Sequence, residues 1–184
     1  YYTMPWEGHD WDRAMRNKNK ILWTYEGANG VKTGYTKKAG RCFVGSSKKN
    51  GMQLIAVVLN CGPMFEESTA LLDYGFENYR NVPIVEQDQF IQTLTVINGV
   101  QEEVNLVAKQ EYSIALNESE LNLIRTKVVV PHALEAPIEA GQWAGSLQIY
   151  LGHELVEEIP IITERGVERR TIWDFFRRMV NIWR

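Results

Sequence analysis

Lys32, Thr33 and Gly34 are residues of types that could line the active site of an acyl-transfer enzyme. A lysine ammonium and a threonine hydroxyl favour an anionic substrate group, and glycine leaves room for a substrate backbone beside a strand. Acyl transfer through a serine also needs a nucleophile, a base that accepts its proton, and donors for the oxyanion. Three common residues are a weak signal alone, so their neighbours decide the interpretation.

Ser46 and Lys49 have the three-residue spacing of a serine nucleophile and its base. That pairing requires a helix, in which the lysine one turn later reaches back to the hydroxyl. We expect both residues at the end of a strand that enters a hairpin, where positions three apart point to opposite faces. The sequence therefore predicts that Ser46 and Lys49 are not a catalytic pair.

Histidines and cysteines offer no second site. His9, His132 and His153 are predicted to lie in turns or at the surface, and His9 with its acidic neighbours is interpreted as a solvated turn. Cys42 and Cys61 lack metal-ligand spacing and are expected diagonally across a hairpin, a geometry that strains a disulfide. We interpret them as two buried free thiols, with their redox state left open. No metal and no cofactor is predicted.

The elements that position Lys32 are predicted to be three antiparallel strands, at residues 30–36, 41–47 and 53–60. Lys49-Asn50-Gly51 is a hairpin signal between the last two strands. The apolar run 54–59 is typical of a strand covered on both faces. A helix is expected from residue 65 to about residue 81, before Pro83. This region is half of an α/β architecture.

Residues 84–163 change to an alternating, all-β pattern that predicts a small β-sandwich. A hairpin is expected from strands 90–97 and 100–108 with a turn at Asn98-Gly99. Further strands are predicted at residues 125–130, 145–151 and 155–162. The predicted fold class is thus α/β plus all-β, with domains at 1–82, 83–165 and 166–184.

Residues 166–184 are predicted to form an amphipathic helix with an apolar half and an arginine-rich half. One interpretation is a helix that packs on the chain's own core or on a partner helix. Its aromatic and basic content favours a helix lying on an anionic membrane surface. The residues expected at the membrane are Trp173, Phe176, Arg177, Arg178 and Trp183.

The composition, with 45% hydrophobic and 23% charged residues in 184, is that of a soluble globular protein. A net charge of −3 without a basic stripe argues against nucleic acid as a partner. No apolar run is long enough to span a bilayer, and no signal peptide is evident. Because the chain begins with Tyr1 rather than Met, we interpret it as a processed or truncated piece.

Three stretches, Asn17 to Trp23, Gly30 to Thr36 and the sequence APIEAGQWAGSLQIY at 136–150, carry a family resemblance. The chain resembles the serine-type D-alanyl-D-alanine carboxypeptidases, the low-molecular-mass penicillin-binding proteins. The resemblance covers essentially the whole chain and implies the C-terminal portion of such an enzyme, with a partial transpeptidase-like (β-lactamase-like) domain. The family also requires an upstream S-x-x-K nucleophile and an S-x-N motif, which are absent, so we expect this chain alone to be inactive.

The resemblance implies roles for five positions on one strand. Lys32 would support the polar network of the cleft, Thr33 would help to bind the terminal carboxylate, and Gly34 would admit the substrate backbone. The backbone N–H of Tyr35 would be one oxyanion donor, and Thr36 would join the substrate-binding positions. The stretch CGPMFEES lacks the arginine that some relatives use to grip that carboxylate.

The resemblance implies that the parent protein removes the terminal D-Ala from peptidoglycan stem peptides through an acyl-serine intermediate. Its expected partners are stem peptides, β-lactams, the N-terminal remainder of the enzyme and the outer face of the cytoplasmic membrane. Two alternatives stay open. The chain could be a non-catalytic stalk or interaction module anchored on the membrane, or a homologue that has lost catalysis.

Overall fold

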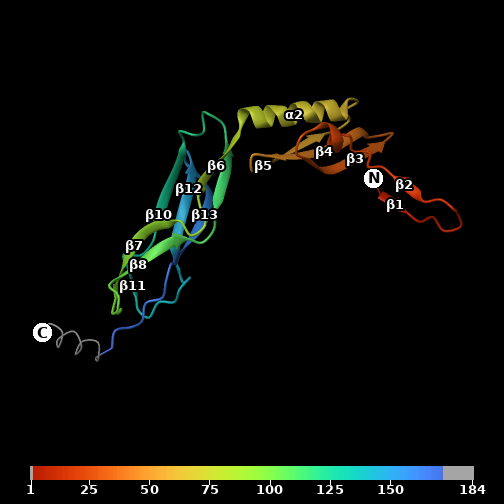
Figure 1. Ribbon diagram of the computed structural model, residues 1–184. Helices are drawn as coiled ribbons and strands as arrows, with labels where there is room; N and C mark the ends of the chain where they lie inside the picture. Colours follow the sequence, from red (N-terminus) through yellow and green to blue (C-terminus); the bar gives the residue numbers. More distant parts are fainter. Residues whose placement is uncertain (1, 172–184) are drawn as a thin grey trace, which may run out of the picture. The chain divides into compact units, whose positions relative to one another are not determined.

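The computed structural model describes residues 2–171, and the chain divides into two compact units, Tyr1–Asn81 and Val82–Arg184 (Figure 1). The first unit is mixed α/β, and the described part of the second unit consists of strands and irregular segments. This coarse division of secondary structure agrees with the prediction from the sequence.

The first unit is built around one three-stranded sheet and one long helix. Its elements are β1 (Tyr2–Met4), β2 (Arg13–Met15), α1 (Ile21–Thr24), β3 (Ala28–Thr36), β4 (Gly40–Lys49), β5 (Met52–Val58) and α2 (Met64–Asn78). The strands β1 and β2 form a separate antiparallel hairpin. The short α1 and the β1–β2 hairpin were not predicted, because three or four residues carry too little periodicity to detect.

The sheet has the order β3-β4-β5, and all its pairs are antiparallel. Lys49 pairs with Met52 across the turn, where Asn50 and Gly51 have φ values of 50° and 79°. Two consecutive positive φ values define the type of hairpin turn that favours the Asn-Gly pair. The predicted hairpin and its register are therefore confirmed.

Only one face of this sheet is covered within the described residues. Phe43, Ala56 and Val58 are buried there against Leu72 of α2. On the opposite face Ile55 and Val57 are 64% and 55% exposed. The prediction that this strand is covered on both faces is thus wrong for the part of the chain described: its apolar residues alternate between a covered face and an open one.

Eight strands follow α2 in the described chain. They belong to the second unit, apart from the first two residues of the first of them. They are β6 (Arg80–Val85), β7 (Phe90–Ile97), β8 (Glu103–Ala108), β9 (Tyr112–Leu116), β10 (Ile124–Val129), β11 (Ala133–Glu135), β12 (Trp143–Leu151) and β13 (Glu154–Thr163). The all-β prediction is confirmed. Sequence analysis missed β6, β9 and β11.

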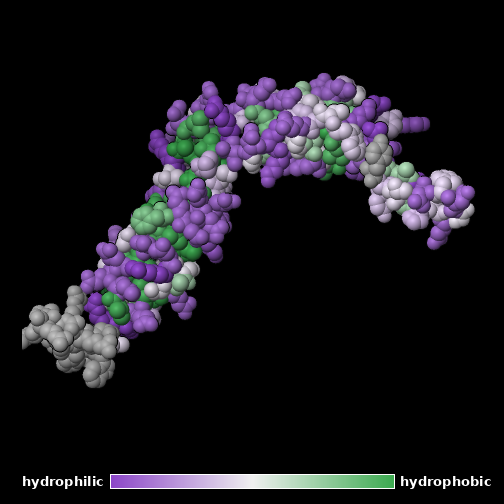
Figure 2. All heavy atoms as spheres, viewed as in Figure 1, coloured by the Kyte–Doolittle hydropathy of each residue, from purple (hydrophilic) through white to green (hydrophobic). Residues whose placement is uncertain are grey.

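Six of these strands form one curled sheet in the order β10-β12-β13-β8-β7-β11, and β6 pairs with β9 in a separate ladder. Fourteen buried residues make one core, which includes Val85 of β6 and is contacted by Tyr112 of β9. The two-stranded ladder therefore packs on the core of the larger sheet. Figure 2 shows hydrophilic residues over much of the visible surface of this unit, with apolar ones between them.

The connection between β7 and β8 differs from the predicted two-residue turn at Asn98-Gly99. The β7–β8 ladder includes no residue of β8 before Glu103, and Gly99 forms a bridge with Arg169 instead. The N–H of Arg170 donates to the carbonyl of Asn98 at 2.7 Å. Hydrogen bonds to this distant segment replace those of a tight hairpin, which only tertiary structure could reveal.

The predicted helix 166–184 does not begin at Gly166. Val167 is buried and forms reciprocal backbone hydrogen bonds with Ile138, each 2.9 Å long, so this segment belongs to the core of the second unit. The remaining residues of the predicted helix, 172–184, lie outside the described residues, and with them the expected membrane positions Trp173, Phe176, Arg177, Arg178 and Trp183. Among the described residues, no helix is long and apolar enough to cross a bilayer.

Candidate active site at the K-T-G strand

The residues Lys32, Thr33 and Gly34 lie in β3, which is an edge strand of its sheet in the described chain. Lys32 is opposite Val44, and Val44 is opposite Val57 on the next strand. Residues that are directly opposite in a ladder share one face of the sheet. Lys32 therefore projects on the open face, in the same row as the exposed side chain of Val57.

Thr33 lies on the other face, opposite Phe43, and is half-buried. The Lys32 ammonium donates a hydrogen bond to the backbone carbonyl of Thr33 at 2.7 Å, in an exposed position. In an antiparallel strand the N–H and C=O of one residue point to the same side, and residues two apart point the same way. The backbone N–H of Tyr35 thus shares its direction with the carbonyl that Lys32 contacts.

Gly34 lies beside open space, whereas the side chain of Thr36 has a hydrogen-bond partner. A Cβ on Gly34 would meet nothing closer than the carbonyl of Cys42 at 3.9 Å, so the strand surface is open there. The Thr36 hydroxyl accepts a hydrogen bond from the N–H of Ala39 at 3.0 Å, which supports the tight turn into β4. The structure thus gives Thr36 a local role that sequence analysis did not anticipate.

The segment before β3 is held in place by a buried asparagine. The Asn19 amide donates to the carbonyl of Gly30 at 3.0 Å and accepts from the N–H of Ile21 at 3.2 Å. Its own N–H donates to the side chain of Asn17 at 2.9 Å. An asparagine with both ends of its amide bonded fixes two segments relative to each other. Asn19 therefore positions α1 beside the start of the K-T-G strand.

Ser46 and Lys49 have separate partners, as the rejection of their pairing requires. The Ser46 hydroxyl donates to the side chain of Asn29 at 2.6 Å. The Lys49 ammonium lies 4.2 Å from the ring centroid of Tyr25 and 5.2 Å from that of Phe76, on the helix-covered side. Ser46 has a structural hydrogen bond and no contact with a base.

The sheet around Lys32 is strongly positive. Residues 27–65 contain six lysines and arginines and no aspartate or glutamate, in a chain whose net charge is −3. Such a local excess attracts anionic ligands to the surface that carries it. The sequence was interpreted as having no basic stripe and positive charge only at its far end, and a count of charges by segment shows that this interpretation was wrong.

Tyr25 connects the segment before β3 to helix α2. Its hydroxyl donates to the Asp73 carboxylate of α2 at 2.6 Å. Burial, followed by this hydrogen bond and the charge of Asp73, raises the pKa of the Tyr25 hydroxyl well above its ordinary value of 10.0. Tyr25 stays protonated and donating at neutral pH, so it is a structural clamp.

The other candidate residues do not assemble into a site. His9, His132 and His153 are all exposed, as predicted, and the ring centroid of His9 lies 4.5 Å from that of Trp6 and 5.1 Å from that of Trp11. Both cysteines are unpaired but only half-buried, so the expected full burial is wrong. Among residues 2–171 no group of three or more His, Cys, Asp or Glu side chains could hold a metal ion.

Two parts of this chain match known protein families. Residues 5–62 match D-alanyl-D-alanine carboxypeptidase, and residues 79–169 match the C-terminal domain of penicillin-binding protein 5. The chain is 32% identical over 176 residues to the D-alanyl-D-alanine carboxypeptidase DacC of Escherichia coli, covering 91% of this chain and 44% of the relative. It is 29% identical over 171 residues to DacF of Bacillus subtilis, with the same two coverages.

A solved structure, penicillin-binding protein 5 from Haemophilus influenzae, shares the fold with a TM-score of 0.69 at 24% identity. The alignment covers 91% of this chain and 49% of that one. The chain therefore spans less than half the length of the curated relatives that it matches. It belongs to the D-alanyl-D-alanine carboxypeptidase family and corresponds to the C-terminal portion of such a protein.

Proposed function

We propose that this chain supplies the K-T-G edge and the β-rich domain of a serine-type D-alanyl-D-alanine carboxypeptidase. The whole protein would remove the terminal D-Ala from peptidoglycan stem peptides outside the cytoplasm, through an acyl-serine intermediate that β-lactams also form. The serine would come from polypeptide outside this chain. Without that polypeptide the chain is inactive.

One observation carries the proposal: Lys32 projects on the same face of the sheet as the exposed apolar side chains of Ile55 and Val57. An exposed apolar patch next to a functional residue is typical of a surface that another segment covers. Because the chain spans 44% of each relative above, the remaining polypeptide is the occupant that we propose for this face. It would bring the nucleophile over Lys32.

The backbone of Tyr35 supports the proposed oxyanion donor. Its N–H shares the direction of the Thr33 carbonyl, which is accessible enough to accept a bond from Lys32. A donor at the edge of a sheet, without a strand on its outer side, can bind a developing oxyanion. The cations on this strand, in the turn after it and at the start of β4, which are Lys32, Lys37, Lys38 and Arg41, would also attract a substrate that ends in a carboxylate.

The test is acylation by a fluorescent penicillin. We expect no covalent label on the 184-residue chain, and labelling once the chain is fused to the preceding half of DacF, with release of D-Ala from a D-Ala-D-Ala peptide. Labelling of the isolated chain would contradict the assignment. A folded fusion that neither labels nor releases D-Ala would favour the non-catalytic stalk or a homologue without catalysis.

Within that fusion, Lys32→Gln is expected to lower the acylation rate on the order of 100-fold, as when a group that stabilises transition-state charge is removed. The matched control is Lys38→Gln, which removes the same charge from an exposed position in the turn after β3. We expect the control to change the rate by less than about threefold. Equal losses in both variants would mean that Lys32 acts only through the general positive field.

We propose further that residues 172–184 anchor the protein on the membrane surface, on the basis of their aromatic and arginine-rich sequence. The chain is expected to co-sediment with liposomes that contain anionic lipid, and to lose this binding when residues 172–184 are deleted. Unchanged sedimentation after the deletion would contradict the anchor.

A further inference from the structure

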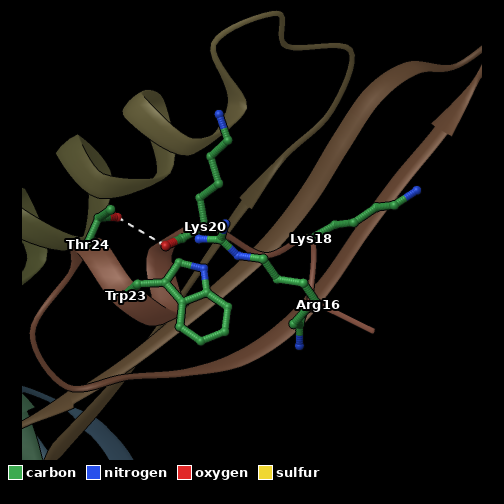
Figure 3. A pocket seen from close by; sticks show the side chains of 6 residues that line it. Arg16, Lys18, Lys20, Trp23 and Thr24 are labelled. Carbon is green, nitrogen blue, oxygen red and sulfur yellow. Dashed lines mark hydrogen bonds between the residues drawn. The ribbon is translucent and has the colours of Figure 1, made fainter. Parts of the chain in front are cut away.

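A pocket of about 500 Å³ lies in the segment that leads into β3, outside the K-T-G edge itself (Figure 3). A volume of this size suits a small ligand of one ring or two. Six residues line it, and three of them are cationic, with no carboxylate among them: Arg16, Asn17, Lys18, Lys20, Trp23 and Thr24. The lining is therefore positive and partly apolar.

The apolar part of the pocket is the indole of Trp23, which is 47% exposed. The Arg16 guanidinium lies over this ring, with its central carbon 5.5 Å from the ring centroid, as Figure 3 shows. Such stacking holds a guanidinium in one orientation at little cost in hydration. A positioned cation thus lies against the indole, and the part of the indole that stays exposed is the apolar surface of the pocket.

The pocket is held in shape by hydrogen bonds within the described chain. Asn17 accepts from the N–H of Asn19, and Asn19 is anchored to Gly30 of β3. The hydroxyl of Thr24 donates to the carbonyl of Lys20 at 3.2 Å, which fixes the short turn that carries Trp23. A preformed site loses less entropy when it binds a ligand.

We propose that this pocket binds an acidic sugar, with the apolar face of the pyranose ring on Trp23 and the carboxylate among Arg16, Lys18 and Lys20. Charge-assisted hydrogen bonds from arginine and lysine favour the carboxylate. The C–H groups on one face of a pyranose pack on an indole, and its hydroxyls can bond to Asn17. A simple anion lacks the ring contact, and a neutral sugar lacks the charge contact, so each binds more weakly. The proposal does not depend on the proposed catalytic function.

The probes are N-acetylmuramic acid, N-acetylglucosamine and acetate, titrated separately into the 184-residue chain. N-acetylmuramic acid carries both the ring and a carboxylate, whereas each of the others carries only one of them. We expect N-acetylmuramic acid to bind at least about tenfold more tightly than either control. Binding is measured by NMR as the shift of the indole N–H signals. The signal that shifts should be the one that Trp23→Leu removes.

Two variants and a matched control test the lining residues. Trp23→Leu should bring the affinity for N-acetylmuramic acid close to that for acetate, and the double variant Arg16→Gln/Lys20→Gln should bring it close to that for N-acetylglucosamine. The control Arg125→Gln/Lys127→Gln removes the same two charges from exposed positions on β10 and should leave the affinity unchanged. Circular dichroism checks that each variant is folded.

Several results would overturn the proposal. These are a failure of N-acetylmuramic acid to saturate, equal affinity for all three probes, or an equal loss of affinity in the control variant. The fusion with the preceding half of DacF gives a further outcome. Binding that is present in the 184-residue chain and absent from the fusion would mean that the added polypeptide covers the pocket, so that the pocket does not bind a sugar in the whole protein.

Discussion

The two units of the chain bury their apolar residues to very different degrees. The second unit has one core of fourteen buried residues, whereas the core of the first unit contains five. The first unit also leaves Ile55 and Val57 exposed on one face of its sheet, and Leu59 exposed just after β5. The second unit can stabilise itself, and the first has apolar surface suited to further polypeptide.

Their charges differ as well. The first unit has eleven lysines and arginines against eight aspartates and glutamates, and residues 82–171 have six against fourteen. Positive charge therefore gathers in the unit with the K-T-G strand, where an anionic substrate terminus would bind. In the second unit the arginines gather at the C-terminal end of the sequence, from Arg165 onward, whereas residues 82–164 are strongly acidic.

The largest effect is expected from Phe43→Ala in the small core of the first unit. Phe43 is 1% exposed and packs edge to face on Phe65 at 5.0 Å. Its truncation should cost about 3–5 kcal/mol of unfolding free energy and unfold the first unit while the second stays folded. Hydrogen exchange read by mass spectrometry should show lost protection in β3–β5 only. Loss of protection in both units would show that they fold as one.

Ile149→Ala should have the next largest effect, in the core of the second unit. Ile149 is fully buried in β12, so the substitution is expected to cost about 2–5 kcal/mol. Because the surrounding core is larger, we expect this unit to remain folded and its urea midpoint to fall. A complete loss of structure would contradict the self-sufficiency of the second unit.

Tyr25→Phe should destabilise the first unit by about 1 kcal/mol, since it removes the hydrogen bond to Asp73. The raised pKa of Tyr25 also makes this stability depend on pH. The unfolded chain loses the phenolic proton near pH 10 and the folded chain keeps it, so the stabilisation is complete below about pH 10 and declines above it. The difference in urea midpoint between the two proteins should shrink from pH 9 to pH 11.

The smallest effect is expected from Val57→Ser on the open face. Val57 is 55% exposed, so the change in unfolding free energy of the 184-residue chain should lie within about 0.5 kcal/mol. In the fusion, where this face would be covered, the same substitution should cost at least about 1 kcal/mol. Equal small effects in both proteins would mean that nothing packs on this face.

Local features of the sequence predicted much of the fold. The Asn50-Gly51 pair fixed a hairpin because positive φ values are needed there, and that hairpin set the register of β4 and β5. The alternation of residues 90–162 predicted an all-β region. The short elements α1 and β11 were missed because three or four residues are too few to display a period.

The sequence alone determined the identity of the K-T-G strand, its likeness to a carboxypeptidase family and the separation of Ser46 from Lys49, since each depends on residue type and local spacing. Only the tertiary structure decided which face of the sheet stays open, that Lys32 projects on that face, and that Arg16 and Trp23 meet in a pocket. The open face and the position of Lys32 depend on pairing between strands, and the meeting of Arg16 with Trp23 depends on how the segment before β3 folds. The apolar run 54–59 is the same pattern whether the residues that pack on it belong to this chain or to other polypeptide. The pattern therefore does not identify the residues that cover this strand.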